Sequence, residues 1–461
     1  MEPRRAQRGE VGSRSEPGEG HPNPRRLSKT ILAVLVVLAT GGPAWAAPQQ
    51  LTLEQALSAA RKANRTLVAE RAHLEQAQTN LSLAWTALFP VVAAQGKYTR
   101  NNIAVNFAIP VGENTNAPPQ VLTIQPSNQL DGIVSFTAPL IVPPAYEALQ
   151  AVKTSVKAAE ADYETSTANV LFAVAQAFYA AGISDEVLAA RQSSIEVASA
   201  TVHIAETRYS VGAVTKADVD RAELALVRAE QAAREARFGR EQAYRALTTL
   251  MQSEGEFTVE PNAAFVPTSE ADGLDMALRL RPEFRAIQLS VRSLAKQSQA
   301  YGWRWSPTVS AFGNARIFNY DNFAVQRHAW AVGAQLDWVL FDGGVRDAQR
   351  RQARAQAREA EARAQVLRDA IRDDLANQHG LLDTKRHAHE AAEKQVVLAQ
   401  ETLELVRTQY EAGSVAELDL LRAQDDLTGA KEALAQAHYE LALADLSLRR
   451  AAGTFPGEAA K

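Results

Sequence analysis

The stretch Tyr410-Glu411-Ala412-Gly413-Ser414, together with the helix-forming sequence that follows it to Leu448, decides how this chain folds. Beyond the turn, leucine and alanine each recur with a period of seven residues. The leucine line is Leu420, Leu427, Leu434, Leu441 and Leu448, and the alanine line is Ala423, Ala430, Ala437, Ala444 and Ala451. Spacings that alternate between three and four residues form the seam of a coiled coil. The pattern therefore predicts a helix that packs along its whole length against other helices.

The same turn and helix occur earlier in the chain, with Tyr209, Gly212 and Asp218 in the places of Tyr410, Gly413 and Asp419. A second set of equivalent positions includes Pro90 and Pro307, each of which ends a helical pattern. This duplication predicts two similar halves, whose spacing is too long for the unit of a solenoid. We expect a first repeat over 47–251, a linker over 252–273, a second repeat over 274–453 and a C-terminal tail over 454–461.

Composition limits the possible functions. The chain has 461 residues, a net charge of −4 and no basic block, which argues against nucleic acid as a partner. It has no cysteine, which excludes disulfides, thiol catalysis, thiolate zinc sites and a lipid-bearing cysteine. Near the N-terminus, basic residues precede the apolar run 31–39, and Ala44-Trp45-Ala46 follows it as a cleavage site. These features predict an export signal peptide over 1–46.

After each of the two prolines the apolar period changes from helical to two. The alternating rows are Val92 to Tyr98, Val134 to Leu140, Val309 to Ile317 and Trp330 to Leu340. They predict four strands of about ten residues, the length that a tilted strand needs to cross a bilayer. Five of the six tryptophans lie in or beside these strands, which suits the aromatic girdle of a membrane barrel. The core of a soluble sheet would explain the strand pattern equally well.

The remaining segments are predicted to be helices joined by loops. Leu51 to Phe89 and Leu274 to Ser306 should each form one helix, and the segments 144–209 and 344–410 should form two very long ones. Gly182 and Gly380 lie within the long helices and could mark bends. The segments 101–130 and 319–329 are expected to be polar loops between paired strands.

Four strands are too few to close a barrel, and unpaired strand edges cannot face lipid. If the sheet is in a membrane, several chains must share it, and three chains would supply twelve strands. The helices would then extend from one end of that barrel, with the glycine turns at their far ends. The expected fold is mainly α with membrane β: a shared β-barrel continued by coiled-coil helices.

The chain resembles the TolC-type outer-membrane efflux family. The resemblance rests on Leu340-Phe341-Asp342-Gly343-Gly344 between strand and helix, on the duplicated Tyr-x-x-Gly turns at Tyr209 and Tyr410, and on the helix-proline-strand junctions at Pro90 and Pro307. It implies a homotrimer with a twelve-stranded barrel in outer-membrane lipid and a periplasmic α-helical tunnel. It also implies a passive exit duct that docks onto a periplasmic adaptor protein and an inner-membrane pump.

The resemblance also assigns site residues. Tyr209, Gly212, Tyr410 and Gly413 would lie where the adaptor docks, and Asp218 and Asp419 would lie at the closed periplasmic aperture. Arg221 and Arg422 stand where some relatives carry a second acid, so Asp419 could pair with Arg422. A helix cap is the alternative role for the two aspartates, although a position six residues beyond the turn glycine is late for one. The first hairpin departs from the family by ending in Pro139-Leu140-Ile141-Val142-Pro143-Pro144.

Other classes of function find less support. No arrangement of residues suggests catalysis or a cofactor site. His387 and His389 are two residues apart and point to different helix faces, so we expect no metal site. A periplasmic coiled-coil scaffold or adaptor without a barrel stays open as the alternative, although an adaptor would show a single helical hairpin.

Overall fold

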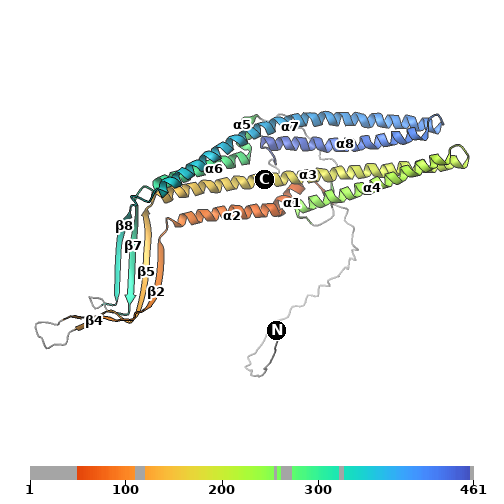
Figure 1. The fold of residues 1–461 in the computed structure, drawn as a ribbon. Coiled ribbons are helices and arrows are strands. Elements are labelled where there is room, and N and C mark those ends of the chain that lie inside the picture. The colour runs from red at the N-terminus through yellow and green to blue at the C-terminus, as the bar shows by residue number, and fades with distance from the viewer. Residues whose placement is uncertain (1–48, 110–119, 254–256, 261–272, 321–325, 457–461) are drawn as a thin grey trace, which may run out of the picture. The chain divides into compact units, whose positions relative to one another are not determined.

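The computed structural model describes residues 49–109, 120–253, 257–260, 273–320 and 326–456. The expected signal peptide, 1–46, lies outside these residues. Within them, the predicted fold class is confirmed: two tandem repeats each contribute two short helices, two strands of a common sheet and a long helical hairpin (Figure 1). The strands lie at one end of the helices, and the two hairpin turns lie at the other.

The elements follow the same order in both repeats. In the first repeat they are α1 Leu53–Ala63, α2 Arg65–Thr86, β2 Val91–Arg100, β5 Asn128–Ile141, α3 Pro143–Ser210 and α4 Lys216–Met251. In the second they are α5 Leu274–Leu280, α6 Pro282–Trp303, β7 Thr308–Phe318, β8 His328–Asp337, α7 Val345–Glu411 and α8 Glu417–Ala452. At 68 and 67 residues, α3 and α7 are each about 100 Å long.

The first helix of each repeat is broken where one continuous helix was predicted. Asn64 separates α1 from α2 and caps α2, because its Oδ1 accepts the backbone N–H of Thr66 at 2.9 Å. Its Nδ2 donates to the carbonyl of Leu250 at 2.8 Å. In the second repeat the break falls at Arg281, because Pro282 occupies the first position of α6 and disfavours a helical residue before it. The breaks lie at equivalent positions of the two repeats.

Two further segments differ from the prediction. The expected loop 101–130 contains a hairpin, β3 Val105–Ile109 paired with β4 Gln120–Gln125, and β5 begins within it at Asn128. Within the expected linker, β6 Phe257–Val259 pairs in parallel with β1 Gln49–Leu51. In the expected tail, Phe455 is buried and its ring meets that of Phe172 edge to face at 6.0 Å.

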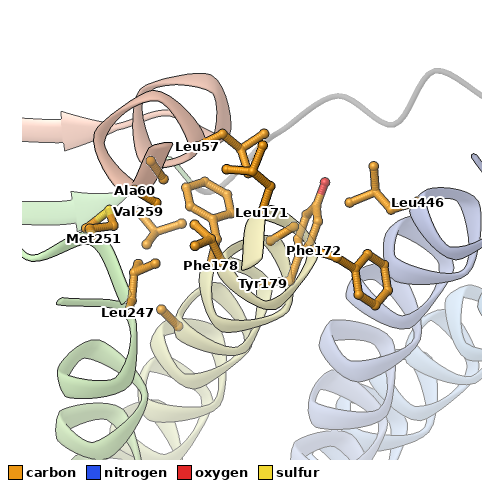
Figure 2. Close-up of a cluster of buried hydrophobic side chains, with 14 of the residues drawn as sticks. Leu57, Ala60, Leu171, Phe172, Phe178, Tyr179, Leu247, Met251, Val259 and Leu446 are labelled. Carbon is orange, nitrogen blue, oxygen red and sulfur yellow. The ribbon is translucent and has the colours of Figure 1, made fainter. Parts of the chain in front are cut away.

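The seam of α8 is buried as predicted. All five residues of the alanine line are buried, as are Leu420, Leu441 and Leu448, whereas Leu427 and Leu434 are half-buried. The largest cluster of buried side chains joins α1, α3, α4, β6 and α8 around Phe178, Leu171 and Leu247 (Figure 2). Among the described helices only α3 has a window apolar enough to span a bilayer, and half of that window is buried inside the protein.

The two mid-helix glycines have different environments, although both helices run through them without a break in secondary structure. A Cβ on Gly182 would lie 2.7 Å from the hydroxyl of Tyr439, so this glycine lets α3 approach α8 closely. Tyr439 is buried, donates to Glu186 at 3.2 Å and packs against Tyr179. A Cβ on Gly380 would meet nothing within 4 Å.

We therefore expect opposite effects from the same substitution at these positions. Gly182→Ala should destabilise the protein by about 1–3 kcal/mol, because the rigid, held ring of Tyr439 must move. Gly380→Ala should be neutral or stabilise it by up to about 1 kcal/mol, through helix propensity. Thermal unfolding of the detergent-solubilised protein measures both. Equal shifts for the two variants would contradict the close-approach role of Gly182.

Candidate functional site

The four-stranded sheet has the order β2-β5-β7-β8, and every neighbouring pair is antiparallel. The register places the predicted apolar rows on one common face. One line across the sheet is Val92, Phe136, Gly313 and Val332, and the next is Ala94, Val134, Ala315 and Trp330. The opposite face carries lines such as Gln95, Ile133, Arg316 and Ala329.

The apolar face is exposed. This exposure indicates that the face contacts lipid and is not the core of a soluble sheet. Trp330 and Val332 are 73% and 72% exposed. A soluble sheet would bury these side chains under a second layer, because large exposed apolar patches mark an interaction surface. On the other face Asp131 is buried in a polar network, where Arg316, Gln129 and Tyr320 donate to it. One apolar face and one polar face are what a membrane barrel requires.

The two outer strands have free edges among the described residues, since β2 pairs only with β5 and β8 only with β7. β2 and β8 run in opposite directions, because three antiparallel pairings separate them. The free edge of β8 in one copy can therefore form an antiparallel ladder with β2 of another copy. Pairing between copies in this way would close the sheet into a barrel. It would also give the backbone N–H and C=O groups of the edge strands the hydrogen-bond partners that they need in lipid.

The second candidate site is the pair of turns at the far ends of the hairpins. Gly212 and Gly413 have φ values of +72° and +76°, a left-handed conformation that glycine adopts without steric cost. The backbone N–H of each donates to the carbonyl of the tyrosine three residues before it, at 2.9 Å in both turns. The two turns therefore have the same hydrogen-bonded geometry.

The two tyrosines, in contrast, differ. Tyr209 is half-exposed, whereas Tyr410 is buried with the guanidinium of Arg208 over its ring at 4.6 Å. Arg208 also donates to the carbonyl of Tyr410 at 3.2 Å. Next to this contact, α3 and α4 share a small apolar cluster, and Gln424 of α8 donates to Thr201 of α3 at 3.3 Å. Tyr410 therefore joins the two hairpins, and Tyr209 is the tyrosine free to contact another protein.

Asp218 is part of a helix cap, so the expectation that it lies too late for one is wrong. The turn extends to Thr215, α4 begins at Lys216, and Asp218 is the third helical residue. Its carboxylate accepts the backbone N–H of Thr215 at 2.9 Å and the hydroxyl at 2.7 Å, and pairs with Arg221 at 2.9 Å. The hydrogen bond from the Thr215 hydroxyl is the main reason that the pKa of Asp218 is lowered.

Asp419 and Arg422 do not reproduce this arrangement. Ala416 takes the place of Thr215 and has no side-chain oxygen, so the capping box is absent from α8. Asp419 and Arg422 are both exposed, and no ion pair joins them in the described part of the chain. The aspartates are thus equivalent in position but not in environment: Asp218 is held, and Asp419 points into solvent.

We call the turn ends of the two hairpins the tip. Glu417 lies at the tip, and it was not identified from the sequence as a site residue. It begins α8, is buried, and neither carboxylate oxygen has a hydrogen-bond partner among the described residues. Burial raises its pKa, the negative charge of Asp218 raises it further, and Arg221 opposes both effects. One signal was present: Glu417 occupies the place of Lys216 in the first repeat, so the charge at the start of the return helix is reversed between the two repeats.

The histidines considered for a metal site do not converge. His387 interacts with Asp383, while the ring of His389 packs against that of His438 at 5.7 Å. Across the described residues no group of three or more His, Asp or Glu side chains could hold a metal ion.

Comparison with known proteins gives consistent results. The family model described as outer membrane efflux protein matches residues 56–252 and 273–454. The chain is 24% identical over 437 residues to the outer membrane efflux protein BepC of Brucella suis, which covers 93% of this chain and 91% of that protein.

Solved structures share the fold. The Campylobacter jejuni CmeC outer membrane channel superposes with a TM-score of 0.73 at 18% identity, covering 87% of this chain and 85% of that one. The open state of the Neisseria gonorrhoeae MtrE outer membrane channel gives 0.71 at 19% identity, covering 87% and 88%.

Proposed function

The chain belongs to the outer membrane efflux protein family, and we propose on that basis that three copies form one continuous exit duct through the outer membrane and the periplasm. Each copy would supply four strands to a twelve-stranded barrel and its long helices to a tunnel below it. The observation that carries the proposal is the sheet with one exposed apolar face and two free edges of opposite direction.

The duct would be passive and would have no catalytic step of its own. A periplasmic adaptor and an inner-membrane pump would deliver substrate to its tip. The alternative of a periplasmic scaffold without a barrel does not fit a member of this family, and a scaffold has no use for an apolar sheet face exposed to its surroundings.

We place adaptor docking at the exposed residues of the turns. Tyr209 is available there, and so is Val211, which is 75% exposed. Gly212 and Gly413 would shape the turns, and Tyr410 would hold the two hairpins in register. The aperture would lie at Asp218, Arg221, Asp419 and Arg422, where three copies bring twelve charged side chains close together.

Conductance tests this proposal. The mature protein, purified in mild detergent, should be a trimer by light scattering and should form channels in a planar bilayer. Asp419→Ala combined with Arg422→Ala should change single-channel conductance, because these exposed charges would lie at the narrowest point. A monodisperse single subunit would contradict the duct, and a trimer whose conductance is unchanged in the double variant would contradict the aperture assignment alone.

A further inference from the structure

A groove between α6 and α7 is lined by positive charge. It has a volume of about 640 Å³, and its walls include Ser298 and Gln299 of α6 and Arg350, Arg351, Arg354 and Arg358 of α7. Among the described residues that line it there is no carboxylate. We call this feature the arginine groove.

Most of this charge has no partner within the described chain. Arg351 pairs with Asp347, but no ion pair or hydrogen bond to another described residue satisfies the guanidinium groups of Arg350, Arg354 and Arg358. Their spacing of four residues puts them on one face of α7. Three like charges along one helix face repel each other unless an anion lies between them. The groove therefore has the charge and the donors of an anion site.

Its place in the fold indicates which anion. Trp338 continues the apolar row of β8, and its indole N–H donates to the carbonyl of Trp305 at 3.1 Å. The guanidinium of Arg346 lies over the ring of Trp305 at 4.0 Å. Arg350 and Arg354 follow Arg346 by about 6 Å and 12 Å along α7. These contacts connect the apolar row of β8 to Arg346, which lies one helical turn before the first arginine of the groove.

That spacing matches the polar layer of a bilayer. Tryptophans mark the edge of the hydrocarbon, and the headgroup layer extends about 5–8 Å beyond it on each side. Trp85, Trp303 and Trp305 lie at the same junction of helices and strands as Trp338, and all four are exposed. With the sheet in the membrane and α7 continuing along the membrane normal, Arg350 would lie at the depth of lipid phosphates and Arg354 just beyond.

We propose that the arginine groove binds the phosphate headgroup of an anionic phospholipid in the periplasmic leaflet of the outer membrane. The inference rests on the proposed placement of the sheet in that membrane. Guanidinium groups bind phosphate oxygens through paired N–H donors, and Ser298 and Gln299 add neutral hydrogen-bonding groups. Bound lipid would neutralise the groove and fix the depth of the barrel in the bilayer.

Lipid binding to the intact trimer tests the proposal. Short-chain phosphatidylglycerol and phosphatidylcholine are titrated separately against the detergent-solubilised protein, and bound lipid is counted by native mass spectrometry. The wild type should prefer phosphatidylglycerol. In R350Q/R354Q/R358Q the affinity for phosphatidylglycerol should fall on the order of a hundredfold, at about fivefold for each lost charge.

The matched control is R368Q/R372Q/R386Q, which removes three exposed arginines of α7 that lie outside the groove. It should bind phosphatidylglycerol as the wild type does, and R354Q alone serves if the groove triple variant does not assemble. Equal binding of the two lipids, equal loss in both triple variants, or complete displacement by an equal concentration of inorganic phosphate would overturn the inference. Light scattering separates the failure of lipid binding from the failure of the proposed duct. A wild type that forms no trimer contradicts the duct, whereas a trimer that does not prefer phosphatidylglycerol contradicts only the lipid site.

Discussion

Val332→Arg is expected to remove assembled channels from the outer membrane almost completely. Val332 lies in the middle of β8, is 72% exposed, and belongs to the apolar face. An arginine at the middle of the bilayer on the lipid face of a barrel costs about 2–4 kcal/mol. A trimer would carry this cost three times, so the amount of trimer should fall by at least about tenfold. The amount of trimer is measured in outer-membrane fractions as the heat-modifiable trimer band.

The neighbouring residue provides the control. Ala331 pairs with Asn314 on the opposite face of the sheet, which the proposed barrel turns toward its lumen. Ala331→Arg adds the same side chain one residue away, and it should assemble and change only the conductance and ion selectivity. If Ala331→Arg fails to assemble and Val332→Arg succeeds, the two faces have been assigned the wrong way round. If both assemble as the wild type does, the sheet does not face lipid.

Much of this fold could be predicted because its determinants are local and repeated. The seven-residue seam predicts which face of α8 is buried, since the helix meets its neighbours along its whole length. The two-residue period predicts the four strands and, through register, a common apolar face. The left-handed turns at Gly212 and Gly413 follow from glycine in a duplicated motif. Each of these signals lies within a few residues of the structure that it specifies.

The features that were missed depend on contacts between distant parts of the chain. The apolar period of residues 53–88 continues across Asn64, and the break there is stabilised by the Leu250 carbonyl, 186 residues away. The hairpin β3–β4 was hidden by the polar composition of the segment around it. Gly182 suggests a bend until Tyr439 of α8 is placed against it. Glu417 looks like an ordinary acidic residue at a helix start until the other hairpin buries it.

Glu417→Gln is expected to abolish most of the pH dependence of the contact between the two hairpins at their turn ends. Glu417 is buried close to Asp218, and its carboxylate has no hydrogen-bond partner in the described part of the chain, so the ionised form is disfavoured there. The groups that face it from α4 are Asp218 and Arg221, and Arg221 is already paired with Asp218. An ionised Glu417 therefore opposes the contact between the hairpins, and a neutral Glu417 or a glutamine favours it.

The direction of the effect follows from the raised pKa of Glu417. The stabilising contribution of the protonated side chain is fully present below the ordinary glutamate value of about 4.3. It is lost as the pH rises through the raised pKa of the folded tip. Wild-type tips should therefore hold together more tightly as the pH falls from neutral, and glutamine should give the tight state at every pH.

Amide hydrogen exchange in the segments 201–222 and 408–424 measures the opening of the tip directly. In the wild type, exchange corrected for its intrinsic pH dependence should slow as the medium is acidified. In Glu417→Gln it should already be slow at neutral pH and change little. Glu223→Gln is the matched control, because Glu223 is an exposed glutamate in the early turns of α4. Two outcomes would show that the buried carboxylate does not govern the contact between the hairpins. One is a Glu223→Gln control that alters the pH profile as much as Glu417→Gln does. The other is a wild type whose tip opens faster in acid.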